Sequence, residues 1–258
     1  MNTEGFTPIF DDCRSKVNQN YGKFRSDPAF YFLAPFKEQV RLPDGEALRI
    51  ADMQDAALAH KYLTIEKPDL GYEDLKFCSL DTVDCRHIMM STIIFKHLKD
   101  VKNVVEIGGG FGNWARINLQ VHDVNSWSIV DLDFVLDLQK WFLKNSLNDD
   151  LYSKVSFIEA GSELPSEGID LVIGAHSLSE ISLDLFMGYL PTLEKAKYLF
   201  YARHKGMPSV QLSNKKLDIL LTMFDIIENV ESEGGAVDNY LLKRKEKQME
   251  TIELKKRL

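Results

Sequence analysis

The sequence predicts an α/β domain with a mostly parallel sheet covered by helices on both faces, preceded by a mainly helical N-terminal region. Three observations predict this fold. Five short apolar stretches alternate with helical stretches, a glycine-rich loop follows the first of them, and the last two apolar stretches are separated only by a short turn. Such alternation produces parallel strands joined by right-handed crossovers, which gather the loops at the carboxyl edge of the sheet.

The chain before the sheet is expected to be irregular at first and then helical. Prolines at positions 8, 28, 35 and 43 disfavour long helices or strands before about residue 45. The segment Pro43–Leu63 is rich in Ala and Leu, which favour a helix. A further helix begins near Asp81 and leads into the first strand. We therefore divide the chain into an N-terminal region at 1–80, a sheet domain at 81–245 and a basic tail at 246–258.

The elements of the sheet domain follow from the apolar pattern. The last two strands should pair antiparallel at the end of the sheet, because the turn between them is too short for a crossover helix. The expected elements are strand Asn103–Ile107, a helix from Asn113, strand Ser126–Val130, a helix from about Phe134 to Leu143, strands Val155–Glu159 and Ile169–Gly174, a helix near Leu183–Leu190, strand Tyr198–Ala202, and the pair Met223–Val230 and Asn239–Lys243.

Composition limits the class of protein. A chain of 258 residues can bury one large core, and a net charge of -8 argues against a protein that wraps a nucleic-acid backbone. The three cysteines, Cys13, Cys78 and Cys85, lack the spacing of a zinc site or a disulfide framework. No stretch reaches the roughly 18 apolar residues that a membrane span needs. We expect a cytoplasmic protein acting on a small molecule, with no membrane or nucleic-acid partner; its oligomeric state is left open.

Two charged features have ordinary explanations. Asp81, Asp84 and His87 share a helical segment that can be imagined as a metal-binding face, but capping and solvation account for two of the three, so no metal is predicted. The Lys- and Arg-rich tail is interpreted as a solvated helix face, with contact to an acidic partner as the alternative.

The glycine loop is the strongest functional signal. An apolar strand runs into Gly108, Gly110 and Gly112 and then into a helix, so that the backbone can turn sharply and a ligand can approach it closely. The backbone donors and the positive end of the helix face that ligand. Nicotinamide and flavin enzymes also have such a loop, and this chain satisfies their looser pattern.

Two acidic residues narrow the choice of ligand. Glu106 lies two residues before the first glycine, where dinucleotide folds normally have an apolar residue and where a carboxylate suits a cationic amino group. Asp131 ends the second strand, where it can accept hydrogen bonds from ribose hydroxyls. Because both kinds of cofactor use the second acid, only Glu106 discriminates between them.

These residues resemble a known family. The pattern Glu106-x-Gly108-x-Gly110-x-Gly112 resembles the glycine motif of class I S-adenosylmethionine (SAM) methyltransferases, and the further blocks Ile129–Leu132, Leu136–Leu143 and His176–Ser182 are similar to sugar O-methyltransferases. The resemblance covers about residues 80–205. It implies a Rossmann-like seven-stranded sheet with a terminal antiparallel hairpin, SAM as cofactor, and an adenine contact at Ser162. Relatives often have Pro where this chain has Asp133.

The candidate catalytic residues follow the fourth and fifth strands. His176 is the candidate base that takes the proton of an alcohol, with Glu180 as its orienting partner. The alternative is that His176 packs or caps while Ser179 caps the next helix. Arg203 and His204 follow the fifth strand and can hold the acceptor or act on it; the alternative for His204 is an exposed loop histidine.

The predicted function is transfer of a methyl group from SAM to a hydroxyl of a sugar or related polyol. The N-terminal region at 1–80 is expected to cover the acceptor. Three alternatives remain open: a methyltransferase for another small metabolite, a nicotinamide-dependent oxidoreductase, and a catalytically silent cofactor-binding protein.

Overall fold

A single seven-stranded sheet organises the chain. The computed structural model describes Phe24 and residues 56–65, 82–205, 210–232 and 235–246. The strand order is β3-β2-β1-β4-β5-β7-β6, and β7 runs antiparallel to both of its neighbours, while the other pairs are parallel. The strands are β1 (Asn103–Ile107), β2 (Ser126–Asp131), β3 (Val155–Glu159), β4 (Leu171–Ala175), β5 (Tyr198–His204), β6 (Phe224–Ser232) and β7 (Val237–Arg244). The predicted fold class is confirmed.

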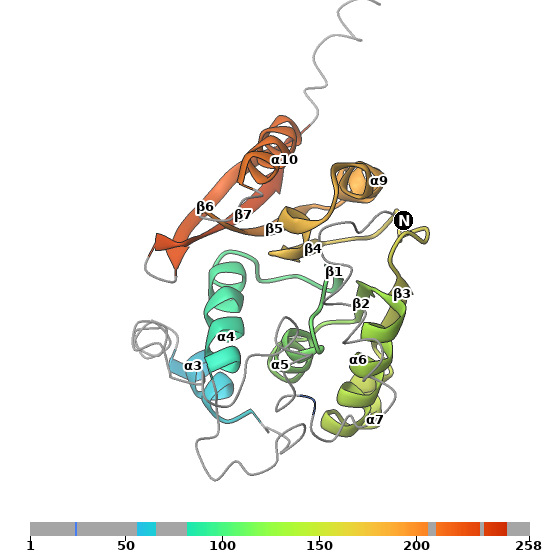
Figure 1. Ribbon diagram of the computed structural model, residues 1–258. Helices are drawn as coiled ribbons and strands as arrows, with labels where there is room; N and C mark the ends of the chain where they lie inside the picture. The colour runs from blue at the N-terminus through green and yellow to red at the C-terminus, as the bar shows by residue number, and fades with distance from the viewer. Residues whose placement is uncertain (1–23, 25–55, 66–81, 206–209, 233–234, 247–258) are drawn as a thin grey trace, which may run out of the picture.

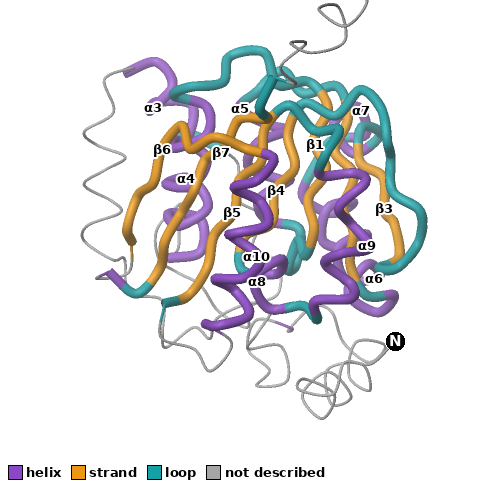
Figure 2. Tube along the Cα trace, turned by 90° about the horizontal axis from the view of Figure 1, so that it is seen from above, coloured by secondary structure: helices purple, strands orange, loops and turns teal. Residues whose placement is uncertain are grey.

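Helices cover both faces of this sheet (Figures 1 and 2). One face carries α4 (Thr82–Phe95), α5 (Asn113–Val121) and α6 (Asp133–Ser146), and the other carries α9 (Leu183–Leu193) and α10 (Val210–Met223). Three shorter helices complete the described chain: α3 (Ala56–Leu63), which contacts α5, α7 (Asp149–Tyr152) and α8 (Ser177–Glu180). Among the described helices, none is long and apolar enough to cross a membrane.

The two faces are filled by alternate residues of the same strands. Val104 packs in the core cluster that includes residues of α4, α5 and α6, whereas Val105 packs in the cluster that includes residues of α9 and α10. Successive strand side chains point to opposite faces, and a parallel sheet buried on both sides needs apolar residues at both. This requirement explains why the central strands read as continuous apolar runs.

The observed elements agree with the expected ones apart from their ends and three further helices, α7, α8 and α10. β4 begins at Leu171 rather than at Ile169, and the carboxylate of Asp170, just before it, accepts hydrogen bonds from the N–H groups of Lys102 and Asn103 at the start of β1. Helix α10 had not been recognised, since polar residues fill its first half. Of the expected helix Pro43–Leu63 the structure describes the last part, which forms α3. Residues 43–55 of this helix and the tail beyond residue 246 lie outside the described residues.

Helix α3 is joined to the sheet domain through His122. The Tyr62 hydroxyl lies 2.6 Å from Nε2 of His122, and the ring of Phe95 stacks on the imidazole at 3.6 Å between centroids. Burial lowers the pKa of His122 to about 4, and the charge of Lys61 lowers it further. The imidazole is therefore neutral at neutral pH and can accept a hydrogen bond from Tyr62.

His122 should make the protein sensitive to acid. A histidine in an unfolded chain has a pKa of about 6.5, so between that value and about 4 the unfolded chain binds a proton that the folded chain does not. The contribution of the neutral His122 to the free energy of unfolding should thus be fully present above pH 6.5 and should be lost as the pH drops towards 4. In His122→Gln, which keeps an acceptor for Tyr62 but cannot titrate, urea unfolding should show a shallower fall. The exposed His60→Gln should keep the wild-type slope; an equal slope in His122→Gln would contradict the assignment.

Candidate functional site

The glycine loop follows β1 and packs directly against α8. Gly108, Gly110 and Gly112 have φ values of 77°, 57° and 91°, in the left-handed region that favours glycine. A Cβ at Gly108 would lie 2.3 Å from Cβ of Ser177, and one at Gly112 would lie 3.1 Å from the Leu143 side chain. Three features of the loop thus require glycine: its turn, its contact with α8 and its contact with α6. Because these three residues have no side chain, a ligand can approach the backbone of the loop closely.

Helix α8 folds back onto the ends of β1 and β4. The Ser177 hydroxyl donates to the carbonyl of Ile107, the last residue of β1. A Cβ at Gly174 would lie 2.2 Å from the Leu178 side chain, so β4 also needs a glycine where the turn begins. His176, at the N-cap of α8, has φ 62° and ψ -47°, and it is the one described residue other than glycine with a positive φ. This strained position aims the residue after β4 at the carboxyl edge.

Asp131 is tied to the glycine loop by a buried glutamine. One carboxylate oxygen accepts a hydrogen bond from the N–H of Leu132 at 2.9 Å, and the other accepts one from Gln139 Nε2 at 2.8 Å. The same Nε2 donates to the carbonyl of Gly110 at 2.9 Å. Gln139 is fully buried on α6. The sequence pattern predicts no role for Gln139, although a glutamine among the apolar residues of α6 is a signal of a buried polar contact.

Glu106 is buried within the sheet, below the glycine loop. Its carboxylate accepts a hydrogen bond from Trp127 Nε1 at 2.7 Å, which gives this acid a structural partner in β2. Burial raises the pKa of Glu106 to about 7, and the nearby charge of Asp131 adds to the rise. Burial also raises the pKa of Asp131 to about 6. A positively charged ligand would stabilise the ionised form of both acids, so the site fits a cationic group.

Two histidines meet at the ends of β4 and β5. The backbone N–H of His176 donates to the backbone carbonyl of Ala202 at 3.0 Å. The imidazole rings of His176 and His204 stack with centroids 4.3 Å apart. Burial lowers the pKa of His176 to about 3, and the charges of His204, Arg86 and His87 lower it further. Nδ1 of His176 is buried and has no hydrogen-bond partner among the described residues. His176 is therefore a neutral imidazole.

Glu180 has different partners from those expected. Burial raises its pKa, and the charges of His204 and Lys216 oppose that rise. Its electrostatic neighbours are thus His204 and Lys216, whereas the groups that shift the pKa of His176 do not include it. Ser179 does not cap the next helix, as the alternative interpretation expected: its hydroxyl donates to the carbonyl of His176. Ser182 caps α9 instead, by accepting a hydrogen bond from the Leu185 N–H at 3.2 Å.

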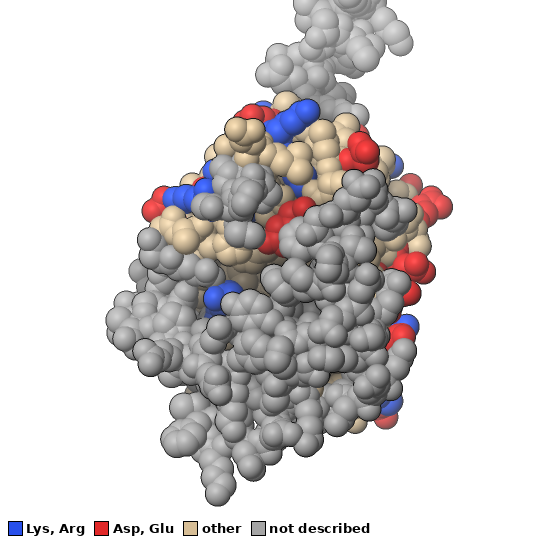
Figure 3. All heavy atoms as spheres, in the orientation of Figure 1, with Lys and Arg blue, Asp and Glu red and all other residues tan. Residues whose placement is uncertain are grey.

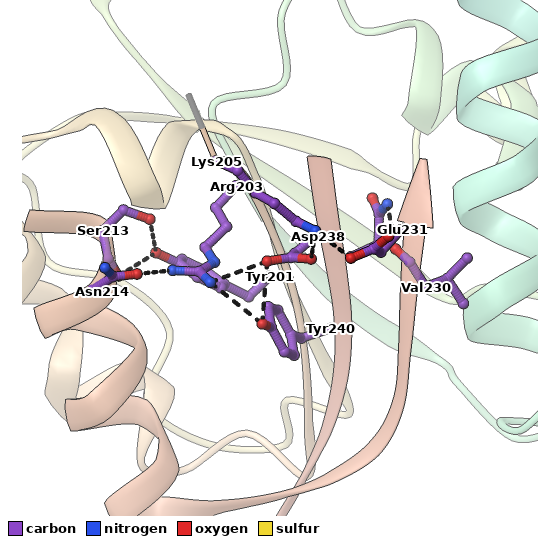
Figure 4. A network of polar contacts seen from close by, with 10 residues as sticks. Tyr201, Arg203, Lys205, Ser213, Asn214, Val230, Glu231, Asp238 and Tyr240 are labelled. Carbon is purple, nitrogen blue, oxygen red and sulfur yellow. Dashed lines mark hydrogen bonds and ion pairs between the residues drawn. The ribbon is translucent and has the colours of Figure 1, made fainter. Parts of the chain in front are cut away.

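Arg203 is engaged in a polar network at the carboxyl end of β5 (Figure 4). Its guanidinium donates to Asn214 of α10 and to Asp238 of β7, the latter at 3.0 Å. Asp238 also pairs with Lys205 at 3.1 Å, and Lys205 pairs with Glu231 of β6. These contacts hold α10 and the antiparallel hairpin to β5. Of the two residues expected to face an acceptor after β5, Arg203 is therefore occupied, and His204 remains.

The residues considered as a metal-binding face have other partners. Asp84 forms an ion pair with Arg116 at 2.7 Å, with both side chains 1% exposed, and accepts a hydrogen bond from Asn113. His87 stacks on Trp114 with ring centroids 5.6 Å apart. Asp81 lies outside the described residues. Within the described residues, no group of three His, Cys, Asp or Glu side chains could hold a metal ion.

Ser162 lies in the turn after β3 and is exposed; its N–H donates to the carbonyl of Glu159 at 3.0 Å. The aromatic rings of Trp127, Phe134 and Phe142 are buried in the core, and Trp141 is partly buried against it. On the face shown in Figure 3, the described Lys and Arg side chains lie scattered among Asp and Glu side chains. The described part of that face thus has mixed charge.

Several solved structures are similar to the fold of this chain. No protein-family model matches the sequence, and no curated protein matches it. Similar structures include a SAM-dependent methyltransferase from Aquifex aeolicus (14% identity, 60% of this chain and 89% of that one, TM-score 0.47) and a glycopeptide N-methyltransferase complexed with sinefungin (11% identity, 60% and 85%, TM-score 0.49). A third is an O-methyltransferase family protein from Burkholderia thailandensis (14% identity, 65% and 60%, TM-score 0.44). The strand order described above defines the fold of this chain.

The contact between Gly108 and α8 can be tested by substitution. Gly108→Ala should destabilise the protein, because a left-handed non-glycine residue costs about 1–2 kcal/mol and the overlap with Ser177 costs about 1–3 kcal/mol more. Gly188→Ala is the matched control, since a Cβ there meets nothing within 4 Å. Adding Ser177→Gly to Gly108→Ala should recover part of the loss in urea unfolding. Equal stability of the two single alanine variants would refute the close contact.

Proposed function

We propose that the protein is a SAM-dependent methyltransferase that transfers a methyl group to a hydroxyl of a small acceptor. The observation that carries the proposal is the placement of two acids, the buried Glu106 and the half-buried Asp131, at the carboxyl ends of β1 and β2 beside the glycine turn. An acid within β1 suits the amino group of the methyl donor, and an acid at the end of β2 suits a ribose. The raised pKa values of both acids support binding of a cation.

The strand order of the sheet favours a methyltransferase over a nicotinamide-dependent oxidoreductase. Classic dinucleotide-binding sheets have the order 3-2-1-4-5-6 with parallel strands. In this chain the antiparallel β7 is inserted between β5 and β6, as the resemblance to class I methyltransferases implied. The glycine loop alone is shared by both classes and does not choose between them.

In this proposal each residue of the edge has a distinct role. Glu106 receives the amino group, Asp131 the ribose hydroxyls, and the turn containing Ser162 the adenine. The backbone around Gly108, Gly110 and Gly112 approaches the ligand where side chains would collide. Gln139 holds Asp131 to the loop. When bound, SAM supplies the methyl group, and the residues of the chain orient the acceptor and accept its proton.

The proton acceptor for a hydroxyl belongs to the His176–His204 pair. Burial and the charges of His204, Arg86 and His87 lower the pKa of His176 to about 3, which makes His176 a poor proton acceptor, whereas His204 is an electrostatic neighbour of Glu180. Electrostatics thus favour His204 as the base, with His176 as its neutral stacking partner. That the acceptor is a sugar or related polyol rests on the resemblance of the later sequence blocks. The role of residues 1–80 as a cover over the acceptor stays a prediction.

Cofactor binding is the first test. In calorimetric titrations S-adenosylhomocysteine should bind and NADH should not. Asp131→Ala should weaken binding by about 1–3 kcal/mol, the range for lost hydrogen bonds to a charged group. Asp137→Ala, on the exposed side of α6, is the matched control and should bind as the wild type does. Binding of NADH alone would replace the methyltransferase proposal by the oxidoreductase one, and an unaffected Asp131→Ala would move the ribose contact to Asp133.

The proton acceptor is the second test. Methyl incorporation is first screened over sugars and glycosides. With the acceptor so identified, His204→Ala should lower turnover by roughly 10²–10⁴, the usual contribution of general acid–base catalysis, while S-adenosylhomocysteine binding stays unchanged. His97→Ala, whose histidine pairs with Glu228 on β6, is the control. A larger loss in His176→Ala than in His204→Ala would return the base to His176, and normal turnover in both would exclude the pair.

A further inference from the structure

A fully buried lysine lies outside the roles proposed so far. Lys216, on α10, has no exposed surface. Its ammonium group donates to three backbone carbonyls, those of Leu178 at 2.9 Å, Ser179 at 3.0 Å and Ile181 at 2.5 Å. An ammonium has three N–H donors, so all of them are used. The three carbonyls belong to α8 and the residue that follows it.

These carbonyls need a partner from outside the helix. Helix α8 has only four residues, and the last carbonyls of a helix find no N–H donor within that helix. They carry the negative end of the helix dipole, which a cation complements. A methionine would fill a similar volume without the cost of burying a charge, but it would leave the carbonyls unpaired. The interaction is therefore specific for an ammonium group.

The surroundings of Lys216 are partly apolar and partly acidic. Its Nζ lies 5.7 Å from the ring centroid of Phe186 on α9. Burial lowers the pKa of Lys216 to about 8, and the charge of Glu180 opposes this effect. Close to pH 8 the ammonium begins to lose a proton, and with it one of its three donors. The neutral amine cannot bind all three carbonyls.

We propose that Lys216 is a positioning residue that holds α8, and through it His176 and Glu180, at the carboxyl edge of the sheet. The inference rests on the proposed function, in which these residues and His204 act on the acceptor. Helix α8 is fastened at its start by the bond from Ser177 to Ile107 and at its end by Lys216. Removing the second attachment would free the turn that carries His176.

Helix α10 connects this attachment to the carboxyl end of β5. Besides Lys216, it carries Ser213, which contacts the Tyr201 hydroxyl at 3.2 Å, and Asn214, which binds Arg203 (Figure 4). Tyr201 and Arg203 precede His204 on β5. One helix therefore contacts the segments that carry both histidines, which gives a physical reason for the stacking of His176 on His204.

Side-chain ¹⁵N NMR of the histidines tests the proposal without an acceptor, with signals assigned from His176→Ala and His204→Ala. In the wild type His176 should stay neutral to well below its ordinary pKa, and its signals should show an inflection near pH 8 from Lys216. In Lys216→Met, His176 should protonate at a pH at least one unit higher and the inflection should disappear. The groups that also face His176 are His204, Arg86 and His87, and Glu180 faces Lys216.

Lys215→Met is the matched control, because Lys215 is the exposed neighbour on the same helix and its loss should change neither signal. A folded Lys216→Met with wild-type His176 signals overturns the proposal. If Lys216→Met does not fold, the wild-type titration decides: an inflection near pH 8 that persists in Lys215→Met supports the proposal, and a flat profile overturns it. S-adenosylhomocysteine titration of the wild type is read separately, since failure of that binding would refute the proposed cofactor and not the attachment of α8.

Discussion

The close approach of α8 to the ends of β1 and β4 is the constraint on which the site depends. Because Gly108 and Gly174 have no Cβ, the chain can leave β4 and fold immediately back over the glycine loop. Ser177 then reaches the last carbonyl of β1, and His176 takes a strained backbone conformation at the turn. Interiors packed at this density accept few alternatives, so the loop that approaches a ligand and the turn that carries the histidine are positioned by one contact.

The contact lies at the topological switch point of the sheet, between β1 and β4, where open α/β sheets bind their ligands. The two sides of this point differ in charge. On the side of β1 and β2 the acids Glu106 and Asp131 favour a cation, and on the side of β4 and β5 the imidazole of His176, stacked on His204, is a neighbour of Arg86. This division suits the proposed reaction, which consumes a cationic donor and removes a proton from a neutral acceptor.

Buried or half-buried polar side chains connect the site to the surrounding elements. Gln139 joins α6 to the glycine loop, Lys216 joins α10 to α8, and Arg203 joins β5 to α10 and β7. Each is expensive to bury unless its hydrogen bonds are made, so each selects one arrangement of the elements it connects. The antiparallel hairpin thus supports the site from a distance through Asp238, which is buried between Arg203 and Lys205.

The sequence by itself determined the strands, the glycine loop and the acids at the ends of β1 and β2, because these depend on local periodicity and on the conformational freedom of glycine. Only the tertiary structure decided that Gln139 binds Asp131, that Lys216 binds α8, and that Glu180 faces His204 rather than His176. These pairings join residues on different elements, and their energies depend on burial. Burial and the charges of neighbouring groups also set the pKa of His176, and a linear pattern of residues contains neither quantity.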